Sequence, residues 1–110
     1  AEALNCKVEI ELKRISPAVI NAEQITQSVQ TAAQVVFPST EIDTGNYLTM
    51  GAEDMAFVME KVPGCYFFVG SANEEKGFIY DHHHPKFDVD ESALPKAAAL
   101  MAAAAAEFLK

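Results

Sequence analysis

The period of the apolar residues changes near Ser16 and Pro17, and this change limits the possible folds more than any other feature. In the preceding segment, NCKVEIELKRI (5–15), apolar and polar residues alternate. Strict alternation predicts a half-buried β-strand with one face in water, as in antiparallel sheets. Pro17 ends the pattern because it has no backbone N–H for a strand ladder.

A different period follows, and it is that of an amphipathic helix. Five apolar residues of the segment 25–36 fall on one helical face: Ile25, Val29, Ala32, Ala33 and Val36. We expect Asn21 to be the N-cap of this helix, with Glu23 in its first turn. Phe37 and Pro38 mark its end.

The rest of the chain predicts alternating strands and helices. A short strand is expected at 41–44, followed by a loop that carries Gly45 and Gly51. A short helix is expected in AEDMAFVMEKV (52–62) and a turn at Pro63-Gly64. CYFFVG (65–70) is typical of a strand buried on both faces, as in an α/β sheet. An alanine-rich helix is expected to end near Leu109.

These two patterns predict two different sheets, and therefore a domain boundary near residues 16–21. Residues 1–16 would be the last strand of one domain, and residues 17–110 part of an α/β domain. The chain begins without methionine, in the middle of a strand pattern, and we therefore expect it to be a fragment.

Charge and composition narrow the range of partners. The formal net charge is −8, and the eight basic residues are scattered. Nucleic acids and anionic membrane surfaces require Lys/Arg patches, so neither is an expected partner. The longest strongly apolar run, 97–106, is too short to span a bilayer. Cys6 and Cys65 form no metal-binding spacing, and we expect buried free thiols, in a cytoplasmic protein, rather than a disulfide.

All three histidines of the chain, His82, His83 and His84, are adjacent in IYDHHHPKFDVDE (79–91). A neutral imidazole is a common metal ligand, and the following proline stiffens the backbone. Adjacent side chains on an extended chain point in opposite directions, so at most two of the three can share a target. A solvated polar loop is the alternative interpretation.

Two acidic groups are further candidates. Gly51 precedes Glu53 and Asp54 at the expected start of a short helix, where free N–H groups could approach a ligand. Acids there also stabilise the helix dipole, which is a sufficient structural explanation. Asp88, Asp90 and Glu91 could be metal ligands, but Asp90 is expected to cap the final helix instead.

Three segments together resemble the C-terminal end of the M20 metallopeptidases. They are SPAVIN (16–21), MGAEDMAFVMEKVPGCYFFVGSANEEKG (50–77) and HHPKFDVDESALP (83–95). Within that family they are similar to the amidohydrolase branch, which includes hippurate, N-acyl-amino-acid and auxin-conjugate hydrolases. The resemblance implies that residues 17–110 form the C-terminal part of a two-metal, exopeptidase-like α/β catalytic domain. Residues 1–16 would be the last strand of an α+β satellite domain, which carries the dimer contact in many members.

The resemblance also assigns roles to individual residues. The family's metal-ligand histidine stands two positions before the proline, which is His83 here. His84 would occupy a variable position, and His82 departs from the usual apolar residue. The substrate-side loop would contain Gly51, Glu53 and Asp54. No catalytic residue is expected within the chain, because the general-base glutamate and the other metal ligands lie upstream in the family.

The implied activity is hydrolysis of the amide bond of N-acyl amino acids or small peptides. Two divalent metal ions (zinc, manganese or cobalt) would be the cofactors, and the full-length protein would be a homodimer through the satellite domain. This chain alone would be inactive. Two alternatives remain: an inactive homologue, and a stand-alone metal-binding or interaction module that uses the histidines alone.

Overall fold

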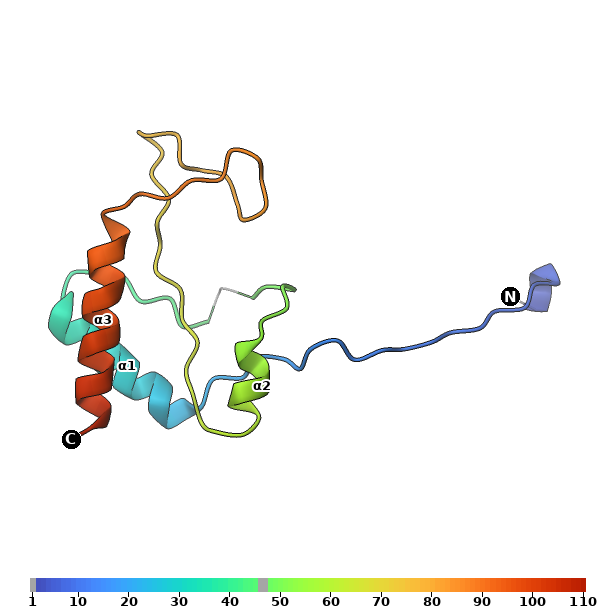
Figure 1. The fold of residues 1–110 in the computed structure, drawn as a ribbon, viewed down its shortest axis with the longest axis horizontal. Coiled ribbons are helices and arrows are strands. Elements are labelled where there is room, and N and C mark those ends of the chain that lie inside the picture. Colours follow the sequence, from blue (N-terminus) through green and yellow to red (C-terminus); the bar gives the residue numbers. More distant parts are fainter. Residues whose placement is uncertain (1, 46–47) are drawn as a thin grey trace.

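The structure is a computed structural model that describes residues 2–45 and 48–110. Its elements follow the order of the chain (Figure 1). They are the 3₁₀ helix η1 (Glu2–Leu4) and the α-helices α1 (Glu23–Val36), α2 (Met55–Met59) and α3 (Ala93–Phe108). Within the described ranges, the β pairing consists of one isolated antiparallel bridge between Asn73 and Phe78.

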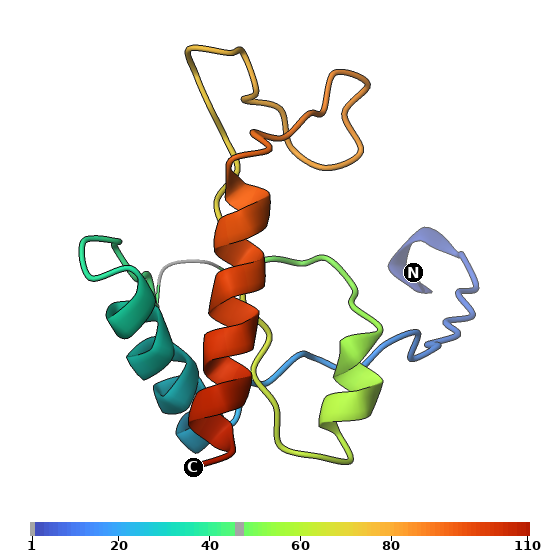
Figure 2. The same cartoon turned by 60° about the vertical axis from the view of Figure 1, so that its left-hand side comes forward.

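Helices α1 and α3 pack against each other, and both views show them side by side (Figures 1 and 2). The predicted apolar stripe of α1 is confirmed. Its members are all buried or half-buried: Ile25, Val29, Ala32, Ala33 and Val36. Three alanines and one leucine lie on the shielded face of α3, where alanine allows close approach: Ala93, Ala97, Leu100 and Ala104.

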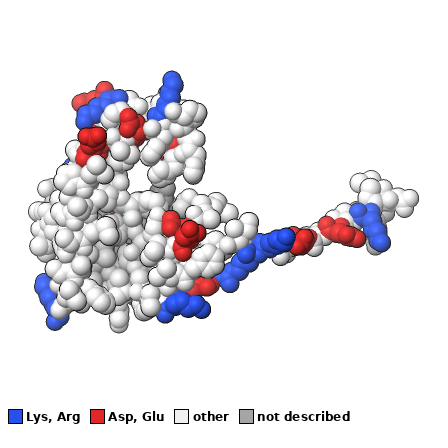
Figure 3. All heavy atoms as spheres, viewed as in Figure 1, with Lys and Arg blue, Asp and Glu red and all other residues white. Residues whose placement is uncertain are grey.

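A second apolar stripe of α3 is exposed. Leu94, Met101 and Phe108 recur every seven residues and are 61%, 65% and 67% exposed. A helix that is apolar on all sides is typical of a buried position in a larger protein. Figure 3 shows that the side of the molecule over the helices carries few charged groups.

The chain buries little of its surface. Its radius of gyration is 19.2 Å, whereas about 13 Å is usual for a compact domain of this size. Its accessible surface is 9598 Å², against about 6,000 Å² for a folded protein of this mass. Among the described residues, the fully buried apolar side chains are three alanines, Ala32, Ala56 and Ala93. No helix in these ranges has the length and hydrophobicity needed to cross a membrane.

The strand expected at 5–15 is absent from the structure. The segment is an extended arm that leads away from the helices (Figure 1). Val8, Ile10 and Leu12 are 60%, 80% and 92% exposed. The physical reason is that a strand requires a partner, and no described segment pairs with this one. Cys6 is also exposed, contrary to the expected burial, although both cysteines are free as predicted.

The segments 41–44 and 65–69 are likewise irregular rather than strands, so the described residues show helices where an α/β fold was expected. CYFFVG has the composition of a central strand but lacks strands on either side. Part of the loop expected after residue 44, residues 46–47, lies outside the described ranges. Helix α2 forms within its predicted segment but covers only Met55–Met59.

Asn21 is not the N-cap of α1, which is Ala22. Asp90 is likewise not the N-cap of α3, which is Ser92. It lies in the turn before the helix, where its backbone carbonyl accepts the Ala93 N–H at 2.9 Å and its Oδ1 accepts the Ser92 N–H at 3.0 Å. The carboxylate thus satisfies a backbone donor at the helix start that would otherwise lack a partner.

Candidate functional site

The histidines lie in a loop, residues 79–89, between the Asn73–Phe78 bridge and α3. Two consecutive turns shape it. The His84 N–H donates to the Asp81 carbonyl at 3.2 Å, and the Phe87 N–H donates to the His84 carbonyl at 2.9 Å. The loop therefore has its own backbone structure, and the three imidazoles occupy different positions in it.

Two of the three imidazoles contact aromatic rings of the same loop. The His84 ring stacks on Tyr80 with 4.2 Å between centroids and 6° between planes. Its Nδ1 also accepts the Lys86 N–H at 3.1 Å. The His82 ring lies 5.0 Å from Phe87. Among the described residues, the His83 ring makes no such contact, and it is exposed.

The backbone of His83 is unusual. Its φ is 68°, in the left-handed region that favours glycine. His83 is the third residue of the Asp81–His84 turn, a position at which turns of type II require positive φ. A strained non-glycine residue at such a position suggests that its side chain has a use. The sequence alone did not separate His83 from its neighbours; only the family resemblance did.

A metal ion would find one ligand in this loop rather than a complete site. In residues 2–45 and 48–110, no three His, Cys, Asp or Glu side chains gather closely enough to hold a metal ion. Protein zinc sites use three or four such ligands. The exposed imidazole of His83 fits the part of a single ligand whose companions come from outside these residues.

Glu53, on the predicted substrate-side loop, has a structural role. Its Oε1 accepts the Met55 N–H at 3.1 Å, which caps α2, and its Oε2 accepts the Tyr66 hydroxyl proton at 2.9 Å. These hydrogen bonds, first from Met55 and then from Tyr66, lower the pKa of Glu53 below its usual value. The carboxylate is therefore ionised and held at the start of α2.

The other two residues of that loop are more open. Asp54 is exposed, and its side chain makes no cap to α2. Gly51 is exposed as well, and its N–H donates to Thr49 Oγ1 at 3.1 Å. Of the two adjacent acids, Asp54 is the one whose carboxylate is turned to solvent rather than to the protein.

Asn21 takes part in the same network, which was not predicted. Its Nδ2 donates to the Tyr66 carbonyl at 2.9 Å, and its Oδ1 accepts the Tyr66 N–H at 2.8 Å. The side-chain amide thus makes the reciprocal pair of bonds that a residue on a neighbouring strand would make. Ala22 continues the pairing through its N–H to the Gly64 carbonyl at 2.8 Å. An asparagine just before a helix is typical of an N-cap, so the sequence did not indicate that Asn21 pairs with the backbone of Tyr66.

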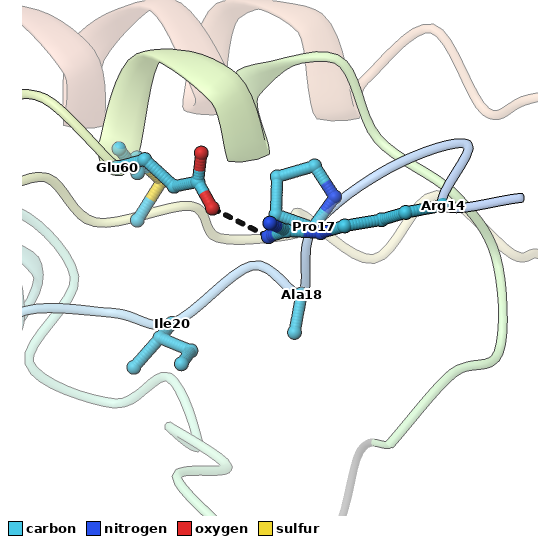
Figure 4. Close-up of a pocket in the computed structure, with 6 residues that line it drawn as sticks. Arg14, Pro17, Ala18, Ile20 and Glu60 are labelled. Atoms are coloured by element: carbon cyan, nitrogen blue, oxygen red, sulfur yellow. Dashed lines mark hydrogen bonds and ion pairs between the residues drawn. The ribbon is translucent and has the colours of Figure 1, made fainter.

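The two candidate loops are not brought together in the part of the chain that the structure describes. In the described ranges, no hydrogen bond, ion pair or ring contact joins the His83 loop to residues 51–54. A hollow of about 300 Å³ lies elsewhere, where the arm meets α2 (Figure 4). An ion pair between Arg14 and Glu60 borders it, and none of the predicted site residues lines it.

Comparison with protein families and with characterised proteins agrees with the resemblance seen in the sequence. The model of the Peptidase family M20/M25/M40 matches residues 5–107. Thermostable carboxypeptidase 1 of Saccharolobus solfataricus is 37% identical over 103 residues, covering 94% of this chain and 25% of that protein. No solved structure matches the chain significantly.

Two other similar proteins have different names. IAA-amino acid hydrolase ILR1-like 6 of Arabidopsis thaliana is 47% identical over 60 residues, covering 54% of this chain and 13% of that protein. N-acetyl-L-cysteine deacetylase of Bacillus subtilis is 31% identical over 100 residues, covering 86% and 21%. The chain spans about a quarter or less of the length of these relatives.

Proposed function

Because the chain belongs to the peptidase family M20/M25/M40, we propose that it forms the C-terminal part of a metal-dependent amidohydrolase. The substrate class is an N-acyl amino acid or small peptide, cleaved at its amide bond. The names of three relatives support this class, since a carboxypeptidase, an amino acid conjugate hydrolase and an N-acetyl deacetylase all act on such a bond.

Residues 17–110 would complete the catalytic domain, and residues 1–16 would be the last strand of a satellite domain through which the full-length protein dimerises. The exposed apolar side chains of the arm and the second stripe of α3 support this division. Both surfaces have the composition of buried elements, and each needs covering by polypeptide beyond this chain.

The observation that carries the proposal is the separation of His83 from its neighbours. His82 and His84 contact the rings of Phe87 and Tyr80, whereas His83 presents its imidazole outward from a strained turn. We propose that His83 is one ligand of a site for two divalent ions, zinc, manganese or cobalt. Bound metal would supply Lewis-acid polarisation of the amide carbonyl.

The chain's own contribution on the substrate side would be the loop of Gly51, Glu53 and Asp54. Glu53 fixes the loop to Tyr66 and to α2, and Gly51 leaves room for close approach of substrate. The exposed carboxylate of Asp54 is then available for a polar or cationic group of the substrate. The general base and the remaining metal ligands would come from residues N-terminal to this chain.

The test compares His83→Ala with His84→Ala in the full-length protein. We expect His83→Ala to lose bound metal and most of the turnover of N-acyl amino acids. His84→Ala should retain both, because the His84 ring is engaged with Tyr80. Metal content by atomic spectroscopy and initial rates of hydrolysis would be measured. Equal losses in the two variants would refute the assignment of His83, and a metal-loaded wild type without hydrolysis would indicate an inactive homologue.

A further inference from the structure

Among the described residues, Asp90 is the buried charged residue, with 8% of its surface exposed. It stands between the loop 79–89 and the start of α3. A buried carboxylate is costly unless it is hydrogen-bonded and paired with a cation, so its partners show what it holds together.

The partners of Asp90 come from two directions. On one side, Ser92 at the start of α3 donates its N–H to Oδ1 at 3.0 Å. On the other side, Lys76 Nζ donates to both oxygens at 3.1 and 3.0 Å, and Asn73 Nδ2 donates to Oδ2. The Asp90 N–H also donates to the Ser71 carbonyl at 2.9 Å. Asp90 therefore ties the C-terminal end of the histidine loop to the segment 71–76.

The N-terminal end of the same loop is tied to that segment as well. Asn73 and Phe78 exchange two backbone hydrogen bonds, each of 2.9 Å. Asn73 thus contacts both ends, through its backbone to Phe78 and through its amide to Asp90. Figures 1 and 2 show the two loops next to each other beyond the N-terminal end of α3. We call this set of contacts among Asn73, Lys76, Phe78 and Asp90 the clasp.

We propose that Asp90 is a positioning residue for His83, acting through the clasp; this inference rests on the proposed role of His83 as a metal ligand. The clasp fixes both ends of the loop, so that the turn carrying His83 fluctuates less before metal arrives. Residues that orient a metal ligand change metal affinity by 10- to 100-fold when replaced. A carboxylate needed only to begin α3 would affect that helix instead.

Asp90→Asn in the full-length protein tests this, with Asp88→Asn as the matched control. Both variants remove one negative charge at the C-terminal end of the loop that carries His83. Asp88, however, is exposed, and its Oδ1 accepts the N–H of its own neighbour Val89 at 2.8 Å. The readouts are the zinc dissociation constant and hydrogen exchange of residues 79–89 in the metal-free protein.

We expect Asp90→Asn to weaken zinc binding by roughly 10- to 100-fold and to speed exchange across 79–89, with unchanged exchange in α1 and α3. Asp88→Asn should stay within about twofold of the wild type, as for surface changes outside such contacts. Lys76→Gln changes a half-exposed partner of Asp90 and should shift both readouts in the same direction, by less. If Asp90→Asn does not fold, Lys76→Gln tests the inference in its place.

Four outcomes of these measurements bear on the role of Asp90. Zinc affinity as high in Asp90→Asn or Lys76→Gln as in Asp88→Asn would overturn the inference, as would loss of affinity with equal loss of protection in α1 and α3. A wild type that binds neither zinc, manganese nor cobalt would overturn both the inference and the proposed function. Zinc binding that depends on Asp90, in a protein without amidohydrolase activity, would leave the inference standing and remove the proposed activity.

Discussion

Replacing Asn21 by alanine removes the two hydrogen bonds that join the residue before α1 to Tyr66. A hydrogen bond contributes about 0.5–1.5 kcal/mol net, so two contribute about 1–3 kcal/mol. Asn21 is exposed and water replaces part of the loss, which places the expected cost at about 1–2 kcal/mol. A change of this size raises the population of the locally open state by a factor of about 5–30.

The assay is hydrogen exchange at the Tyr66 amide, whose proton is bonded to Asn21 Oδ1. We expect its exchange to accelerate by that factor in Asn21→Ala. The Phe37 amide, bonded to Ala33 at the far end of α1, should not change. Asn21→Asp provides a matched control, because it keeps the acceptor for the Tyr66 N–H and loses only the donor to the Tyr66 carbonyl. A Tyr66 amide that exchanges at the wild-type rate in Asn21→Ala would refute the reasoning.

Three further predictions concern other contacts. Tyr66→Phe should raise the lowered pKa of Glu53 towards 4.5, as measured by carboxyl NMR. Because folding lowers this pKa, ionised Glu53 stabilises the folded protein above about pH 4.5. That stabilisation is lost as the pH falls through the pKa of Glu53 in the folded state. His83→Gly should relieve the backbone strain at φ 68° and raise the free energy of unfolding, measured by denaturant titration, by up to about 1 kcal/mol. The same variant should abolish metal binding, and retained metal would exclude His83 as a ligand. Arg14→Ala should cost less than about 1 kcal/mol, because the Arg14–Glu60 pair has 69% and 40% of its side chains exposed, and the cost should vanish in about 1 M salt if the effect is electrostatic.

Helices were predictable because their patterns are local. The stripe of α1 and the alanine-rich body of α3 depend on residues three or four positions apart, and both helices form where the patterns place them. The strands were not predictable in the same way. The arm and CYFFVG have strand patterns, but ladder bonds need a second strand, and the described residues supply none.

The site shows the same division. Asp90 was expected to cap the final helix and stands two residues before its N-cap, Ser92. Its bonds to Asn73 and Lys76, however, reach back 17 and 14 residues. Asn21 and Tyr66 are 45 residues apart, and no local motif indicates their pairing. His83 was distinguished by a family motif, and its role as a ligand stays a prediction.

The packing of α1 on α3 has a consequence for synthesis on the ribosome. The two helices are separated by the 56 residues from 37 to 92. At about 5–20 residues per second, synthesis of α3 begins roughly 3–11 seconds after α1 is complete. During that interval Ile25, Val29 and Val36 have no α3 to cover them, and the nascent chain exposes an apolar surface. Chaperones that bind apolar segments of nascent chains would be able to bind α1 during this interval.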